Sequence, residues 1–180
     1  MFIKTSKLSQ VLKKAYKGAG IHLERQGSRL IVATAYMYIE ADTATMTNAF
    51  KAAVITFAGE LPESGTAITI TEDMEQNNIP KSYDRRLFTK DLVAGKQFNE
   101  TAFTYNGDTV LQAADGTLIT VPAKEWAVYS LKDKGESEDD PDGWFEDGTG
   151  IACRNSTMII ELSYNMPDDT LSALQDKRLI

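Results

Sequence analysis

Turn dipeptides containing glycine divide much of this chain into short apolar runs, and they favour antiparallel strand pairs. Asn106-Gly107 and Asp115-Gly116 separate three runs, over residues 101–105, 109–114 and 117–122, that we expect to form a meander. Asn-Gly and Asp-Gly are preferred in two-residue hairpin turns, which need positive φ at their central positions. Parallel strands would need much longer connections. The spacing therefore predicts antiparallel pairing.

Further strand signals follow the same pattern on both sides of this meander. Gln26-Gly27-Ser28 is a turn signal between apolar runs over residues 21–24 and 29–41. The second run is apolar on both alternating faces, as in a strand buried on both sides, and a break near Thr34 or Ala35 into two strands is the alternative. The remaining strand signals lie at residues 2–3, 66–73, 150–154 and 157–164.

The first helix predicted by the sequence is amphipathic. Ser6 is its expected N-cap, and Gly18 and Gly20 are expected to end it. Its apolar residues recur at helical spacing and share one arc: Leu8, Val11, Leu12, Ala15 and Tyr16. Four lysines share the opposite arc, and we call them the lysine face: Lys7, Lys13, Lys14 and Lys17. We therefore expect their ammonium groups to stand together at the surface.

The other helix signals are shorter or mixed. Residues 47–62 predict a helix capped by Thr47 or Asn48 and ended by Gly59. Residues 123–134 fit either a helix or a strand. Two more short helices are expected, around residues 82–94 and after an N-cap at Asp168 or Asp169.

Together these elements predict an α+β fold, in which antiparallel hairpins and meanders form one or more sheets and two or three helices pack on one face. Residues 1–73 would form a strand-helix-hairpin-helix-strand half, and residues 74–180 a β-rich half. One continuous domain is the alternative, since 180 residues suit one large domain or two small ones.

Charge is distributed unevenly along this acidic chain. The formal net charge is −7, yet residues 1–29 carry +6, so the remainder carries −13. Much of the negative charge lies in residues 132–150, where no periodicity appears and a solvated loop is predicted. Trp144 and Phe145 within it are expected to pack back onto the core, or else to dock a protein partner. Glu138, Asp140 and Asp142 imitate half of a calcium-binding loop, but Thr149 stands where such a loop needs glutamate.

Motifs for chemistry are few. The sequence contains neither a phosphate-binding glycine pattern nor GxSxG, and it has one histidine, His22, and one cysteine, Cys153. We expect both to be structural, and we assign no catalytic residue, metal or cofactor. A single cysteine allows no internal disulfide, and no run of 18 apolar residues occurs. These features predict a cytoplasmic protein without a membrane span.

Three stretches resemble the subdomains of bacterial-type DNA polymerase sliding clamps. The start, MFIKTSKLSQVLKKAYKGAG, leads into a turn of the form GSRLIVAT over residues 27–34. AFKAAVITFAGELPESGTAITITED resembles the family's second helix, Leu-Pro turn and next strand, and Val121-Pro122-Ala123-Lys124 resembles a helix entry. The resemblance implies lysine-bearing helices that face a channel for double-stranded DNA, with an acidic outside. This chain is shorter than a full clamp subunit, so a ring would need more subunits or would not form.

Three functions are therefore compatible with the sequence. The first is a non-enzymatic, clamp-like module that binds DNA through the lysine face. The second is a protein–protein adaptor or inhibitor that uses the acidic loop with Trp144 and Phe145. The third is a metal-dependent enzyme built from scattered carboxylates.

Overall fold

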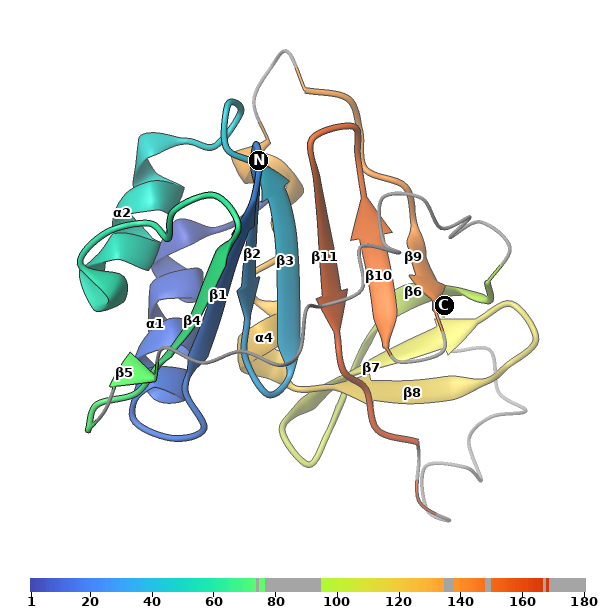
Figure 1. The fold of residues 1–180 in the computed structure, drawn as a ribbon. Helices are drawn as coiled ribbons and strands as arrows, with labels where there is room; N and C mark the ends of the chain where they lie inside the picture. The colour runs from blue at the N-terminus through green and yellow to red at the C-terminus, as the bar shows by residue number, and fades with distance from the viewer. Residues whose placement is uncertain (74, 77–94, 135–137, 148–149, 167, 169–180) are drawn as a thin grey trace.

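The computed structural model describes residues 1–180 except 74, 77–94, 135–137, 148–149, 167 and 169–180. The described residues form one open, eleven-stranded sheet in which every neighbouring pair of strands is antiparallel (Figure 1). The strand order is β5-β4-β1-β2-β3-β11-β10-β9-β6-β7-β8. The predicted α+β class, with antiparallel hairpins and meanders, is confirmed.

Both halves of the chain contribute to this sheet. The first contributes α1 (Thr5–Tyr16), β1 (Ile21–Gln26), β2 (Arg29–Ala33), β3 (Met37–Asp42), α2 (Asn48–Ala58) and β4 (Thr66–Ile70). The second contributes β5 (Glu75–Gln76), β6 (Gln97–Tyr105), β7 (Asp108–Ala113), β8 (Leu118–Val121), α4 (Ala123–Trp126), the 3-10 turn η2 (Leu131–Asp133), β9 (Trp144–Glu146), β10 (Ile151–Arg154) and β11 (Met158–Leu162). β3 pairs with β11, which places Ile39 opposite Ile160 and joins the halves edge to edge.

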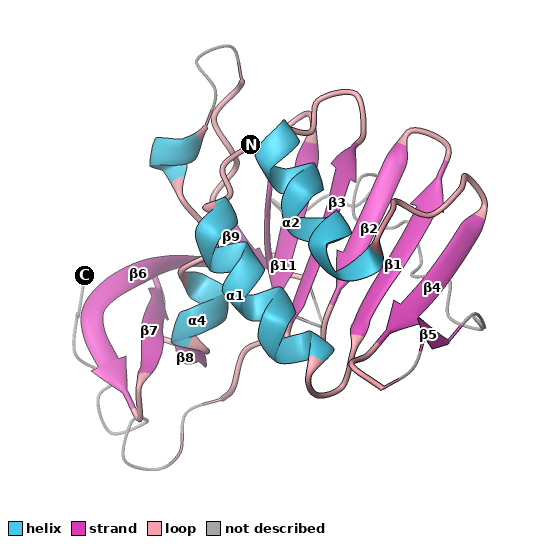
Figure 2. Cartoon of the chain, turned by 90° about the vertical axis from the view of Figure 1, so that its left-hand side faces the viewer, coloured by secondary structure: helices cyan, strands magenta, loops and turns pink. Residues whose placement is uncertain are grey.

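The helices form a single layer on one face of the sheet (Figure 2). α1 and α2 pack against each other, and the ring centroids of Tyr16 and Phe57 lie 5.5 Å apart. Leu8 and Leu12 of α1 and Phe50 of α2 are fully buried in the main core, to which Trp126 of α4 also belongs. Burial of each such side chain stabilises the fold by roughly 1.5 to 3 kcal/mol, so packing on the sheet holds these helices in place.

The apolar run over residues 29–41 forms two strands. β2 ends at Ala33 and β3 begins at Met37, and the Thr34 N–H donates to the Met37 carbonyl at 2.8 Å to close the turn. A single long strand is therefore wrong, and the break near Thr34 or Ala35 is correct. Alternate side chains of β2 enter core clusters on opposite faces of the sheet, which explains why both its odd-numbered and its even-numbered residues are apolar.

Local turn and cap chemistry predicts most other boundaries. Asn106 and Gly107 both have positive φ, 51° and 86°, as their hairpin requires. The Phe50 N–H donates to the Thr47 hydroxyl at 3.2 Å, which confirms Thr47 as the α2 N-cap, and Gly59 ends that helix with φ 75°.

The start of α1 differs from its prediction. The helix begins at Thr5, so Ser6 lies within it, and Lys4 is the N-cap residue without a side-chain capping bond. The Lys4 N–H donates to the Val128 carbonyl at 2.8 Å, while Ile3 forms a β-bridge with Tyr129. Pairing with a distant segment therefore sets where α1 begins, and this pairing leaves no local sequence signal.

The acidic segment is not the solvated loop predicted for residues 132–150. Its described part contains β9, which pairs with β10 on one side and β6 on the other. A strand of three residues is too short to show the alternation that would reveal it. Residues 123–126 take the helical alternative as α4. The helices predicted around 82–94 and after Asp168 or Asp169 lie outside the described residues. Within the described part of the chain, no helix is long and apolar enough to span a bilayer.

Candidate nucleic-acid interface

The lysine face lies on the solvent side of α1. Lys13, Lys14 and Lys17 are exposed and Lys7 is half-exposed, whereas Leu8, Val11 and Leu12 enter the core. The predicted amphipathic arrangement is therefore confirmed. Because the buried side of α1 is anchored in the core, the positions of the four lysine stems on the helix are fixed relative to the sheet.

The described residues include no carboxylate within ion-pair distance of these four lysines. α1 itself contains no acidic residue, so the helix offers no partner one turn away. Three cations elsewhere in the described chain do have such partners, at 2.7 Å for Lys134–Asp140, 2.9 Å for Lys96–Asp115 and 3.4 Å for Arg154–Asp142. The lysine face therefore presents its positive charge to solvent.

Helix stability explains only part of this pattern. Lys13 and Lys14 lie in the last turn of α1, where cations interact favourably with the helix dipole. Lys7 lies in the first turn, where a positive charge is unfavourable for the same reason. At the other end, the Glu72 N–H donates to the Tyr16 carbonyl at 2.9 Å, so the exposed Glu72 and Asp73 border the lysine face there. Carboxylates of the described chain thus border the lysine face at the C-terminal end of α1.

Trp144 and Phe145 are buried, so they are not available as exposed anchors for a partner. Their exposed fractions are 6% and 8%. The Trp144 ring centroid lies 4.9 Å from that of Trp126 and 5.1 Å from that of Tyr129. Packing onto the core, the other expectation for this pair, is what the structure shows. The adaptor hypothesis used these two side chains as contacts for a partner, and their burial therefore removes its support.

The three carboxylates that resemble half of a calcium-binding loop each have a different partner. Glu138 pairs with the amino group of Met1, Asp140 with Lys134, and Asp142 with Arg154. Among the residues that the structure describes, no group of three His, Cys, Asp or Glu side chains is arranged to hold a metal ion. The hypothesis of a metal-dependent enzyme therefore gains no support from the described carboxylates.

His22 occupies a structural position. It lies half-buried in β1, with Nδ1 3.2 Å from the Thr69 hydroxyl oxygen and Nε2 3.7 Å from a Glu24 oxygen. Burial lowers its pKa, and the Glu24 carboxylate opposes this shift. Its neighbours include a hydroxyl and a carboxylate of the sheet.

Cys153 is fully buried in β10, and its thiol donates to the Asp142 carbonyl at 2.9 Å. Burial, reinforced by the Asp142 carboxylate, raises the pKa of the thiol to about 12.

The thiol of Cys153 should react with a disulfide reagent at pH 8 at least about a thousandfold more slowly in the folded protein than in guanidinium. The thiolate is the reactive form, and the raised pKa of the thiol in the folded protein depletes it. Absorbance of the released thiol measures both rates. Equal rates in the two states would contradict this.

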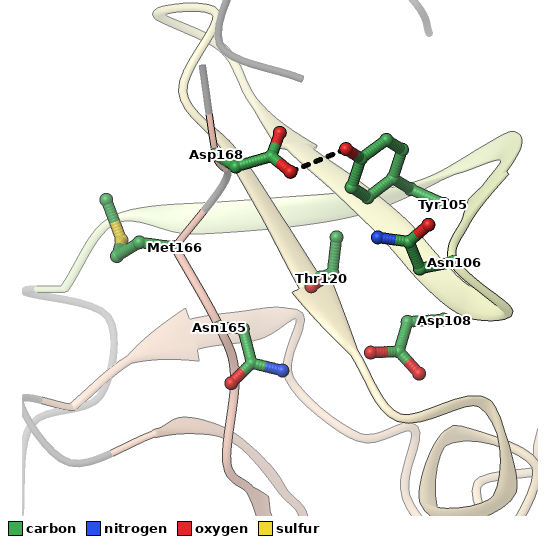
Figure 3. Close-up of a pocket in the computed structure, with 7 residues that line it drawn as sticks. All are labelled: Tyr105, Asn106, Asp108, Thr120, Asn165, Met166 and Asp168. Atoms are coloured by element: carbon green, nitrogen blue, oxygen red, sulfur yellow. Dashed lines mark hydrogen bonds between the residues drawn. The ribbon is translucent and has the colours of Figure 1, made fainter. Parts of the chain in front are cut away.

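A small polar cavity of about 180 Å³ lies elsewhere, at the meander of the C-terminal half (Figure 3). It is lined by Tyr105, Asn106, Asp108, Thr120, Asn165, Met166 and Asp168. The Tyr105 hydroxyl donates to Asp168 at 2.6 Å, and the backbones of Thr120 and Asn165 form a β-bridge. Two carboxylates and no cation line it, so it would repel phosphate and does not extend the lysine face.

Sequence reasoning missed a buried polar group on the sheet face opposite the helices. Glu40 of β3 is 1% exposed and accepts from the Tyr38 hydroxyl at 3.0 Å and from Arg29 at 3.1 Å. Burial and the Glu40 carboxylate both raise the pKa of Tyr38 above its ordinary value. A signal was present in the sequence: side chains alternate between the two faces of a strand, so residues 38 and 40 of β3 were expected to lie on the same face.

Comparison with known proteins adds no relative. No protein-family model matches this chain, and no curated protein matches it at a significant level. The resemblance to sliding clamps therefore stays a prediction, and function has to be argued from the chain's own surface.

Proposed function

We propose that this protein is a non-enzymatic binding module, clamp-like in arrangement, that holds the DNA backbone through the lysine face of α1. The observation that carries the proposal is the set of four lysines on one anchored helix, none with an acidic partner among the described residues. Such lysines neutralise phosphates and release condensed counterions, which drives binding without reading sequence.

The layered architecture supports this proposal. The clamp resemblance implies helices on the DNA side and an acidic outside. Here α1 and α2 lie side by side on one sheet face, while the chain beyond residue 29 carries −13. Salt screens charges over about 10 Å, so a local cationic surface attracts phosphate despite the net charge of −7. Lysine is a compact point charge rather than a planar fork, so weak, sequence-independent binding is expected.

The salt dependence of duplex binding tests the proposal. Four phosphate contacts give a plot of log K against log salt with a slope of about −3.6. The double variant Lys13→Glu with Lys17→Glu should reduce the magnitude of this slope to about 1.8, because two contacts are lost. Fluorescence anisotropy of a short labelled duplex, titrated from low to moderate salt, measures both slopes.

A matched control separates the lysine face from net charge. Lys96→Glu with Lys132→Glu changes the net charge by the same amount, and these residues lie outside α1. Its slope should equal that of the unmodified protein. Absence of binding at low salt, or equal slopes for the two double variants, would overturn the proposal.

A further inference from the structure

An exposed aromatic ring stands at the end of the lysine face. Tyr36, in the turn between β2 and β3, is 51% exposed, one of the large hydrophobic side chains most open to solvent in the described chain. The Lys14 ammonium nitrogen lies 6.0 Å from the centre of its ring. A cation at this distance from an aromatic face is attracted by it. An exposed aromatic side chain therefore lies next to the lysine face, beside Lys14.

The backbone beneath this ring is held by hydrogen bonds. The Thr34 N–H donates to the Met37 carbonyl at 2.8 Å, and the Ser163 N–H donates to the Tyr36 carbonyl at 3.0 Å. The strand register places Ala33 opposite His22, near the start of β1, so this turn lies at the same end of the sheet as the loop that follows α1 (Figure 1). The backbone that carries the ring is thus held by the sheet, while about half of the side chain stays exposed.

Base stacking is the interaction that suits this combination. Proteins that bind single strands pair cationic side chains on the backbone with aromatic rings on which bases stack. Inside a duplex, each base is already covered by its neighbours and is unavailable to an outside ring. A ring beside phosphate-binding lysines therefore gains a partner only where a base is unpaired.

We propose that Tyr36, together with Lys14, is a stacking platform for an unpaired base, so that the module prefers duplex DNA with a single-stranded overhang to blunt duplex. This inference rests on the proposed function and narrows its ligand. Stacking on one aromatic residue contributes a discrimination of at least about fivefold. The lysine face supplies the affinity that both DNA forms share.

Three labelled probes test the inference by anisotropy: a blunt duplex, the same duplex with a short overhang, and that duplex with abasic sites throughout the overhang. The unmodified protein should bind the overhang probe at least about fivefold more tightly than the blunt one. Tyr36→Ala should remove this preference, whereas Tyr36→Phe should keep it, because phenylalanine retains the ring. The abasic overhang should bind like the blunt duplex, and this arm leaves the protein unchanged.

The outcomes separate the two proposals. Binding to blunt duplex without an overhang preference would overturn the stacking platform and leave the lysine face intact. The same holds if the preference survives Tyr36→Ala or the abasic substitution. Failure of every probe to bind at low salt would overturn both proposals.

Discussion

Phe50→Ala is expected to lower the free energy of unfolding by about 3 to 5 kcal/mol. Phe50 is fully buried, and it is the side chain through which the first turn of α2 enters the main core. Its truncation removes apolar burial and leaves a cavity that the packed sheet can only partly fill. Urea denaturation followed by circular dichroism measures the change.

The same helix offers the control for this measurement. Ile55 of α2 is 39% exposed, so Ile55→Ala should cost less than about 1 kcal/mol. Both substitutions shorten a side chain in one helix, and their difference isolates burial from helix propensity. Similar losses for the two variants would show that α2 does not pack on the sheet as described.

Glu40→Ala is expected to destabilise the protein by about 1 to 3 kcal/mol at neutral pH. The substitution removes a carboxylate that accepts from the buried Tyr38 hydroxyl and pairs with Arg29. The loss falls mainly on Tyr38, which stays buried, whereas Arg29 is 38% exposed and can be solvated by water. The pKa of Tyr38 is higher in the folded protein than in the unfolded chain. The contribution of Tyr38 to the free energy of unfolding is therefore complete below about pH 10 and is lost as the pH rises further.

An equivalent pair near the surface gives the comparison. Glu146 accepts from the Tyr164 hydroxyl at 2.7 Å, and both side chains are half-exposed, so Glu146→Ala should cost about 1 kcal/mol or less. A double-mutant cycle of Glu40→Ala with Tyr38→Phe should show less than additive loss, because the two substitutions remove the same hydrogen bond. Additive losses would contradict the coupling.

What the sequence predicted well is what local chemistry determines. The Asn106-Gly107 turn, the Thr47 cap and the Gly59 helix end each depend on residues within a few positions of one another, and all three are confirmed. The lysine face was predictable for the same reason, since helical periodicity brings residues three and four apart onto one side. That no described carboxylate pairs with these lysines was not predictable, because such partners can come from distant parts of the chain.

What the sequence missed depends on distant pairing. Lys4 begins α1 because of the Val128 carbonyl, and Glu138 is engaged by the amino group of Met1. The strand β9 lies between β10 and β6, an arrangement with no trace in the local pattern of an acidic stretch, although burial of Trp144 itself was an expectation. The break near Thr34 was one of two alternatives, because a run with apolar residues at both odd and even positions fits one long strand or two short ones.

The place of β11 has a consequence for how the protein is made. It is the last of the described strands along the chain, yet it lies between β3 and β10 in the middle of the sheet. A ribosome that has not yet released residues 158–162 holds two separate strand sets, β5 to β3 and β10 to β8, with nothing between them. Contacts so far apart in sequence form slowly, and unpaired edges promote association between chains. Completion of the sheet must therefore wait until residues 158–162 have left the ribosome.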